Sequence, residues 1–298
     1  MKWRYIVLLF VLLCTGCRGN TSVSEEASFD IVTSFYPVYI FTRNITEGIP
    51  DVNVYNITEN QAGCIHDYQL STANMKQIEN SDVFIINGAG LEGFMDKILE
   101  KEEIDVLDSG EHIELLENRF YDGYNEHIWL SISNAILQVE AIGNGLIARD
   151  PAHEQQYREN MQAYIDKLKA LRNDLRQELY GYENIEIVTS HDAFSYFAKD
   201  FGIEIFDVIE RGEDVSPTPK EMSELIAGLK ESSVVGIFAE QDASDKLSKM
   251  VSDETGIKVY TLDSITSGEA DLESYEKKMQ ENIKRIKESV KSYYEVDA

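Results

Sequence analysis

The sequence predicts an α/β protein with two doubly wound parallel-sheet lobes, joined by one long rigid helix. Short apolar, β-branched runs alternate with segments of helical periodicity along most of the 298 residues, a pattern typical of parallel sheets with helices on both faces. The alternation occurs once on each side of residues 151–179, a segment without proline or glycine after its first residue. We therefore expect a bilobed molecule with a cleft between the lobes.

The chain is strongly acidic, with a formal net charge of −27. A protein that binds nucleic acid needs a basic face to neutralise phosphates, so this function class is excluded. The acidity predicts a solvated surface and is compatible with cation binding.

The N-terminus predicts export. Lys2 and Arg4 precede an apolar run, residues 5–14, which is too short to cross a bilayer of about 30 Å as a helix and has the length of a signal-peptide core. Residues 1–16 are therefore expected to be a signal peptide. Thr15-Gly16-Cys17 resembles a bacterial lipobox, although Cys14 stands where leucine is usual. We expect lipidation of Cys17, a tether over 17–28, and an extracytoplasmic, lipid-anchored protein of the cell envelope.

The first lobe is predicted to span residues 29–149. Strands are expected at 29–35, 52–57, 83–86 and 104–107, and helices at 37–48, 75–80, 91–102 and 128–148. A linking helix is predicted over 150–180, with Asp150 as its cap and Pro151 at its first position. We expect this helix to brace the two lobes.

The second lobe is predicted to span residues 181–298. Strands are expected at 185–189, 203–208, 234–239 and 258–262, and helices at 193–201, from 219 onwards, at 243–255 and at 272–293. Thr218 and Glu221 have the spacing of a capping box, which predicts the helix start at Pro219.

Four polar residues follow predicted strands at equivalent positions: His66, His127, His191 and Asp263. Side chains at the carboxyl ends of strands in open α/β sheets face the crevice that holds ligands. Three imidazoles and a carboxylate make a four-coordinate set that suits Zn²⁺. Because the four are scattered in sequence, each taken alone is also compatible with a structural role.

The mature chain resembles the solute-binding proteins of bacterial zinc and manganese ABC importers, the cluster A-I family, and is most similar to its zinc-receptor branch. The segments that carry the resemblance are Gly63-Cys64-Ile65-His66-Asp67-Tyr68, Glu126-His127-Ile128-Trp129-Leu130, Ser190–Phe197 and Val259–Asp263. The resemblance implies two α/β lobes joined by one long helix and a metal site between them. It implies His66, His127, His191 and Asp263 as ligands, a permease and its ATPase as partners, a monomer, and no enzymatic activity.

Three features of the sequence bear on which metal is bound. Two are departures from the family pattern, and the third is the residue at position 191. Leu70-Ser71-Thr72 replaces the proline-containing segment usual after the first ligand, and the loop 108–126 is not rich in histidine, which weakens the zinc interpretation. His191, in contrast, stands where manganese receptors tend to have a carboxylate. Mn²⁺ prefers oxygen ligands, so three imidazoles favour zinc. We expect Zn²⁺ as the transported solute, with Mn²⁺ as the alternative.

Several further residues lie near the predicted ligands. Cys64 is expected to be a small buried residue rather than a ligand. Asp67 and Asp192 could orient the histidines that precede them or lie at the surface, and Glu240 could support the site or contact the importer. His112 and His153 are expected to be solvated.

Two enzyme classes compete with the receptor interpretation. Residues 88–93 read G-x-G-x-x-G between a strand and a helix, which is the dinucleotide fingerprint; its place after a third strand and the export signal weigh against it. An extracytoplasmic zinc hydrolase is the other, with Glu240 as base, but no H-E-x-x-H signature is present.

Overall fold

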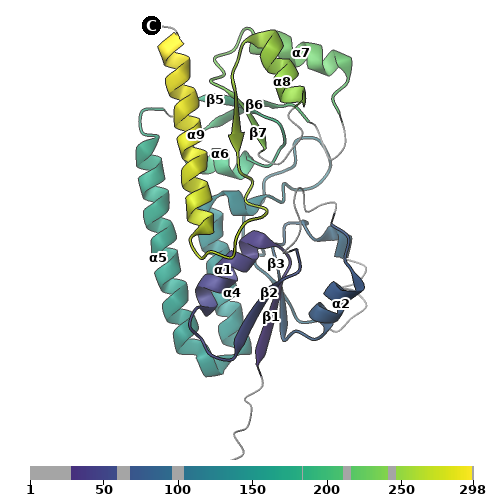
Figure 1. Ribbon diagram of the computed structural model, residues 1–298, viewed down its shortest axis with the longest axis vertical. Coiled ribbons are helices and arrows are strands. Elements are labelled where there is room, and N and C mark those ends of the chain that lie inside the picture. The colour runs from purple at the N-terminus through teal and green to yellow at the C-terminus, as the bar shows by residue number, and fades with distance from the viewer. Residues whose placement is uncertain are drawn as a thin grey trace, which may run out of the picture.

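The structure is a computed structural model that describes residues 28–58, 68–95, 104–182, 184–210, 216–240 and 246–296. Two four-stranded parallel sheets form its framework, with strand orders β2-β1-β3-β4 and β6-β5-β7-β8 (Figure 1). The first sheet contains β1 (Phe29–Thr33), β2 (Val52–Asn56), β3 (Val83–Ile86) and β4 (Val106–Asp108). The second contains β5 (Glu186–Thr189), β6 (Glu204–Val208), β7 (Ile237–Glu240) and β8 (Val259–Leu262). The predicted fold class is confirmed.

Helices cover both faces of each sheet. In the first lobe they are α1 (Tyr36–Thr46), α2 (Thr72–Glu79), the 3₁₀ turns η2 (Gly93–Met95) and η3 (Ile128–Leu130), and α4 (Ile132–Arg149). The second lobe contains α6 (Ser195–Phe201), α7 (Pro219–Leu229), α8 (Lys246–Thr255) and α9 (Ser274–Val296). Alternate residues of β1 show the double winding, because Ile31 joins the main core and Val32 packs on the opposite face with Ile78 of α2.

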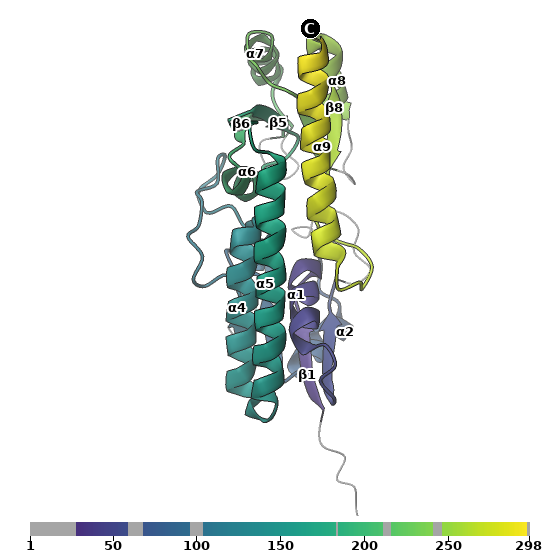
Figure 2. The same ribbon diagram turned by 90° about the vertical axis from the view of Figure 1, so that its left-hand side faces the viewer.

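The turn η4 (Pro151–His153) and helix α5 (Glu154–Glu178) connect the lobes. With 25 residues, α5 is about 37 Å long, and it runs beside both lobes (Figure 2). Its apolar face packs into one core cluster that contains Ile31 of the first lobe and Ile187 of the second. The two sheets therefore share a continuous core along the connecting helix.

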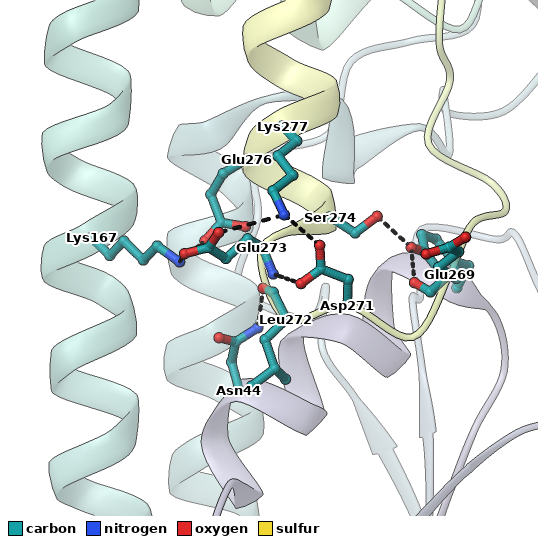
Figure 3. Close-up of polar contacts among 10 residues, drawn as sticks. Asn44, Lys167, Glu269, Asp271, Leu272, Glu273, Ser274, Glu276 and Lys277 are labelled. Carbon is teal, nitrogen blue, oxygen red and sulfur yellow. Dashed lines mark hydrogen bonds and ion pairs between the residues drawn. The ribbon is translucent and has the colours of Figure 1, made fainter.

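The start of α9 crosses back to the first lobe. Asn44 of α1 donates its Nδ2–H to the carbonyl of Leu272 at 3.0 Å, and Lys167 Nζ of α5 lies 2.8 Å from Glu276 Oε1 (Figure 3). The Tyr36 hydroxyl lies 2.6 Å from Ser274 Oγ. These contacts attach the segment after β8 to both α1 and α5.

Several predicted boundaries differ from the structure. The helix expected at 128–148 is broken at Ser131, whose hydroxyl accepts the Asn134 N–H and caps α4. Of the helix expected at 91–102, the described part is the turn η2, and residues 96–103 lie outside the described ranges. The capping box of Thr218 and Glu221 is confirmed.

Asp150 lies at the start of η4 but its side chain makes no capping bond, so that prediction is wrong. Its Oδ2 instead lies 2.6 Å from His153 Nδ1 and accepts the Tyr157 hydroxyl at 2.8 Å. His153 is half-buried and bonded to Asp150 rather than solvated, whereas His112 is exposed as expected. Within the described ranges, no helix has the length and apolar character of a membrane span.

Candidate metal centre

Two of the predicted ligands, His127 and His191, meet between the lobes. His127 precedes η3, and His191 follows β5 after Ser190. Their ring centroids are 5.3 Å apart and the rings stand at 78° to each other. His127 is buried, with 6% of its surface exposed. The fold thus brings together one imidazole from each lobe.

Asn125 fixes the orientation of the His127 ring. Its Oδ1 accepts the backbone N–H of His127 at 3.0 Å, and the same oxygen lies 3.1 Å from His127 Nδ1. Because this oxygen can only accept, Nδ1 carries the hydrogen and Nε2 presents its lone pair. The Asn125 Nδ2–H donates to the carbonyl of Asp192 at 2.6 Å, so one amide positions His127 and the loop that carries His191.

The Nε2 atom of His191 is buried and has no hydrogen-bond partner within the described residues. A buried polar atom without a partner costs roughly 1–3 kcal/mol, so such atoms need an explanation. An imidazole nitrogen left free in this way, on a ring next to that of His127, has the chemistry of a metal ligand. The arrangement fits a soft or borderline divalent cation.

The main chains of two acidic residues, Glu210 and Glu240, are bonded to Ser190, the residue before His191. The Glu210 N–H donates to the Ser190 carbonyl at 2.9 Å, and the Glu240 N–H donates to the Ser190 hydroxyl at 3.1 Å. Burial raises the pKa of the Glu210 carboxyl, with the nearby His191 opposing this rise and Glu240 adding to it. Glu240 was identified from its place at the end of the predicted strand 234–239 and is the last residue of β7; Glu210, two residues after the end of β6, was missed.

Asp263 follows β8, and both its side chain and its main chain are bonded to neighbouring residues. Its Oδ1 accepts the Ile265 N–H at 2.7 Å, and its Oδ2 is paired with the Lys278 ammonium. Asn282 binds both main-chain atoms, accepting the Asp263 N–H and donating to its carbonyl, each at 2.8 Å. Trp129 Nε1 donates to the next carbonyl, that of Ser264, at 2.8 Å, which connects this loop to the residue two after His127.

Of the other residues predicted near the site, the structure describes Asp192 but not His66, Asp67 or Cys64. Asp192 is buried, with its Oδ1 accepting the Ser195 hydroxyl at 2.7 Å, so a surface role is wrong. His66, Asp67, Cys64 and Cys17 lie outside the described residues. Among the residues that are described, no three His, Cys, Asp or Glu side chains are grouped closely enough to hold a metal.

The glycine-rich turn at residues 88–93 is filled by an acidic side chain of its own. Buried Glu92 accepts the N–H groups of Asn87 and Gly88 at 2.8 and 3.1 Å, and the Ser34 hydroxyl at 2.7 Å. In a dinucleotide site such N–H groups face the pyrophosphate, but here a carboxylate of the same chain occupies that place. A β-carbon at Gly88 would also lie 1.9 Å from Asp108 Oδ1. The turn therefore has a packing role.

Comparison with known proteins identifies a family that the chain matches over most of its length. The family model described as zinc-uptake complex component A, periplasmic, matches residues 31–289. The chain is 31% identical to the iron-binding protein YfeA of Yersinia pestis, over 91% of this chain and 89% of that protein. It is 26% identical to the zinc-binding lipoprotein AdcA of Streptococcus pneumoniae, over 94% of this chain and 58% of that longer protein.

A solved structure has the same arrangement. The solute-binding protein FpvC of Pseudomonas aeruginosa, in complex with Mn²⁺, is 28% identical and superposes with a TM-score of 0.80. The superposition covers 89% of this chain and 99% of FpvC.

Proposed function

Because the chain belongs to the zinc-uptake component A family, the metal-binding receptors of ABC importers, we propose that its cargo is zinc. The protein is an extracytoplasmic metal-ion receptor and not an enzyme. The two competing interpretations, a zinc hydrolase and a dinucleotide-binding enzyme, are therefore rejected. The proposed ligands are His66, His127, His191 and Asp263. The observation that carries the proposal is the meeting of His127 and His191, together with the buried His191 Nε2, which no described residue hydrogen-bonds.

The chemistry of these donors supports zinc over manganese. Zn²⁺ binds imidazole nitrogen at about 2.0–2.1 Å and accepts four ligands, three of which are histidines in the proposed set. Mn²⁺ prefers oxygen and lies at the weak end of the affinity order for divalent metals. The names of the relatives mention iron, zinc and manganese, and at their level of identity they do not select among the three.

Manganese is the second candidate, and one feature favours it. The main chains of Glu210 and Glu240 are both bonded to Ser190, and the Glu210 carboxyl interacts electrostatically with His191 and with Glu240. Oxygen ligands from such carboxylates are the donors that Mn²⁺ prefers. If either carboxylate coordinated the metal, the preference of the site would shift from Zn²⁺ towards Mn²⁺.

The proposed cycle needs only small movements. The lobes share one core along α5 and are joined again by α9, so metal capture is proposed to rearrange side chains and loops rather than swing the lobes apart. The loaded receptor would then dock on a permease powered by its ATPase. The boundaries 29–149, 150–180 and 181–298, cleavage of 1–16, the tether over 17–28 and lipidation of Cys17 are part of this proposal.

The decisive measurement is metal content after purification, followed by direct competition between Zn²⁺ and Mn²⁺. We expect one zinc per chain and displacement of bound manganese by zinc. His191→Ala should abolish tight 1:1 binding, and His112→Ala, which changes an exposed histidine, should not. Unchanged zinc binding by His191→Ala would contradict the ligand assignment. Retention of a Cys17→Ser variant in the membrane fraction would contradict the anchor.

A further inference from the structure

The carboxylate of Asp263 has both oxygens engaged. Oδ1 accepts a backbone N–H from Ile265, and Oδ2 is paired with the ammonium of Lys278. The two side chains are partly buried, with 19% and 23% of their surfaces exposed. A partly buried ion pair is screened less by water and salt than one at the surface, so this pair is a substantial competitor for the carboxylate.

Helix α9 builds this arrangement from one face. Lys278 and Asn282 are four residues apart and therefore neighbours on the helix surface. Asn282 holds the main chain of Asp263 while Lys278 holds its side chain. The Lys278 stem lies against Gly268, where an added β-carbon would be 3.3 Å from Lys278 Cε and closer still to the Tyr36 ring. The lysine stem is thus packed against the loop after β8.

A lysine ammonium and a divalent cation compete for the same oxygen. We propose that Lys278 is a specificity-determining residue: a cation built into the protein that any metal must displace from Asp263. The inference rests on the proposed function, since it takes Asp263 as a ligand. An incoming metal must break this ion pair before it can bind the carboxylate oxygen, and the free energy of the pair is subtracted from that of metal binding.

The cost of displacement differs between metals. Zinc bound by imidazoles depends less on an oxygen ligand than manganese does, because Mn²⁺ prefers oxygen. Lys278 therefore penalises manganese more than zinc. The residue would contribute to metal choice without touching the metal.

The test is a double-mutant cycle on the full chain with purified Zn²⁺ and Mn²⁺, measured by competition with a chromophoric chelator. Lys278→Met removes the charge and keeps most of the stem. We expect it to tighten Mn²⁺ binding about tenfold and Zn²⁺ binding about threefold, since removing a partly buried competitor of this kind changes affinity on that order. In an Asp263→Asn background the same change should alter neither affinity by more than about twofold.

Lys277→Met is the matched control. Lys277 is the neighbouring residue on α9, but it pairs with Asp271 at 2.5 Å at the surface (Figure 3), and its replacement should leave both affinities within about twofold. If Lys278→Met does not fold, Lys278→Arg replaces it. The guanidinium can bind both carboxylate oxygens and should weaken Mn²⁺ binding further.

The outcomes separate this inference from the function on which it rests. If His127→Ala binds zinc like the wild type, the proposed site itself is wrong. If His127→Ala loses zinc but Lys278→Met binds both metals like the wild type, only the role of Lys278 is refuted. An equal gain from Lys278→Met with and without Asp263 would also refute it, because the effect would not pass through the carboxylate.

Discussion

The imidazole rings of His127 and His191 meet edge to face across the two lobes, and the side chain of Asn125 is bonded to both sides of this contact. Its carbonyl oxygen orients one ring, and its amide hydrogen holds the main chain next to the other. The distance between the histidines is therefore set by a residue that is itself no metal ligand.

Asn125→Ala should weaken metal binding by roughly 10- to 100-fold, the usual effect of removing a residue that orients a ligand. The His127 ring loses the Asn125 oxygen that accepts its Nδ1–H. The loop of His191 loses the hydrogen bond from Asn125 to the Asp192 carbonyl. Calorimetric titration with Zn²⁺ measures the change. Asn118→Ala is the control, because the Asn118 side chain accepts the N–H groups of Phe120 and Tyr121 in its own loop. Equal affinities of the two variants would show that Asn125 does not position the site.

Saturating zinc should raise the thermal stability of the wild-type protein. A ligand at 100 times its dissociation constant stabilises the folded state by about 2.7 kcal/mol when it does not bind the unfolded chain. Differential scanning calorimetry with and without Zn²⁺ measures the shift in Tm. His191→Ala should show none of it. A shift of equal size in that variant would point to a binding site elsewhere.

Glu92 should make the protein less stable as pH rises towards neutrality. Burial raises the pKa of its carboxyl to about 7 from an ordinary value of 4.5. Because the folded state holds this proton more tightly than the unfolded chain, the contribution is fully present below pH 4.5 and lost as pH rises through 7. A shift of this size is worth about 3 kcal/mol.

Glu92→Gln cannot ionise, so its unfolding free energy should depend less on pH between 4.5 and 7. Denaturant unfolding at a series of pH values makes the comparison, with Glu79→Gln as an exposed control on α2. Glutamine can keep the bonds from Ser34 and Asn87, but its amide group cannot accept the Gly88 N–H. A pH profile identical to that of the wild type would show that Glu92 is ionised in the folded protein throughout.

Asp200 connects three helices near the junction of the lobes. Its carboxylate accepts the Ser131 hydroxyl at 2.9 Å, the Ser133 N–H at 2.9 Å and the Arg176 guanidinium at 2.5 Å. Asp200→Ala leaves these donors without an acceptor and should lower the unfolding free energy by about 3 kcal/mol. Urea denaturation tests this. Asp174→Ala, at an exposed position of α5, should change it by less than about 0.5 kcal/mol.

The sequence pattern was sufficient for the sheets because the central strands are short apolar runs and the edge strands β2 and β6 alternate apolar and polar residues. His127 follows β4 only after a long loop and was selected with the help of the family resemblance, whereas His191, Asp263 and Glu240 could be selected as candidates because they stand at or just beyond the ends of such runs. Their local signal is strong, since in a parallel sheet all carboxyl ends lie at one edge.

The partners of these residues could not be predicted in the same way. Lys278 reaches Asp263 from a helix that begins eleven residues later, and Asn125 reaches Asp192 across the lobes. Such pairs depend on how helices pack, and no periodicity in the sequence encodes that packing. Asp150 illustrates the same limit. Its position predicts a helix cap, but its carboxylate instead accepts the hydroxyl of Tyr157, seven residues further along the chain.

The position of α9 has a consequence for biogenesis. Its buried residues, Tyr275, Met279, Ile283, Ile286 and Val290, belong to the same core cluster as Ile31 and Phe41 of the first lobe. An exported chain enters its compartment from the N-terminus, so the first lobe emerges long before the helix that completes its core. Until the last residues have been translocated, that lobe exposes the apolar surface that α9 covers. Maturation of the receptor is therefore expected to await complete translocation, and a chain stopped before residue 274 should be a substrate for envelope proteases.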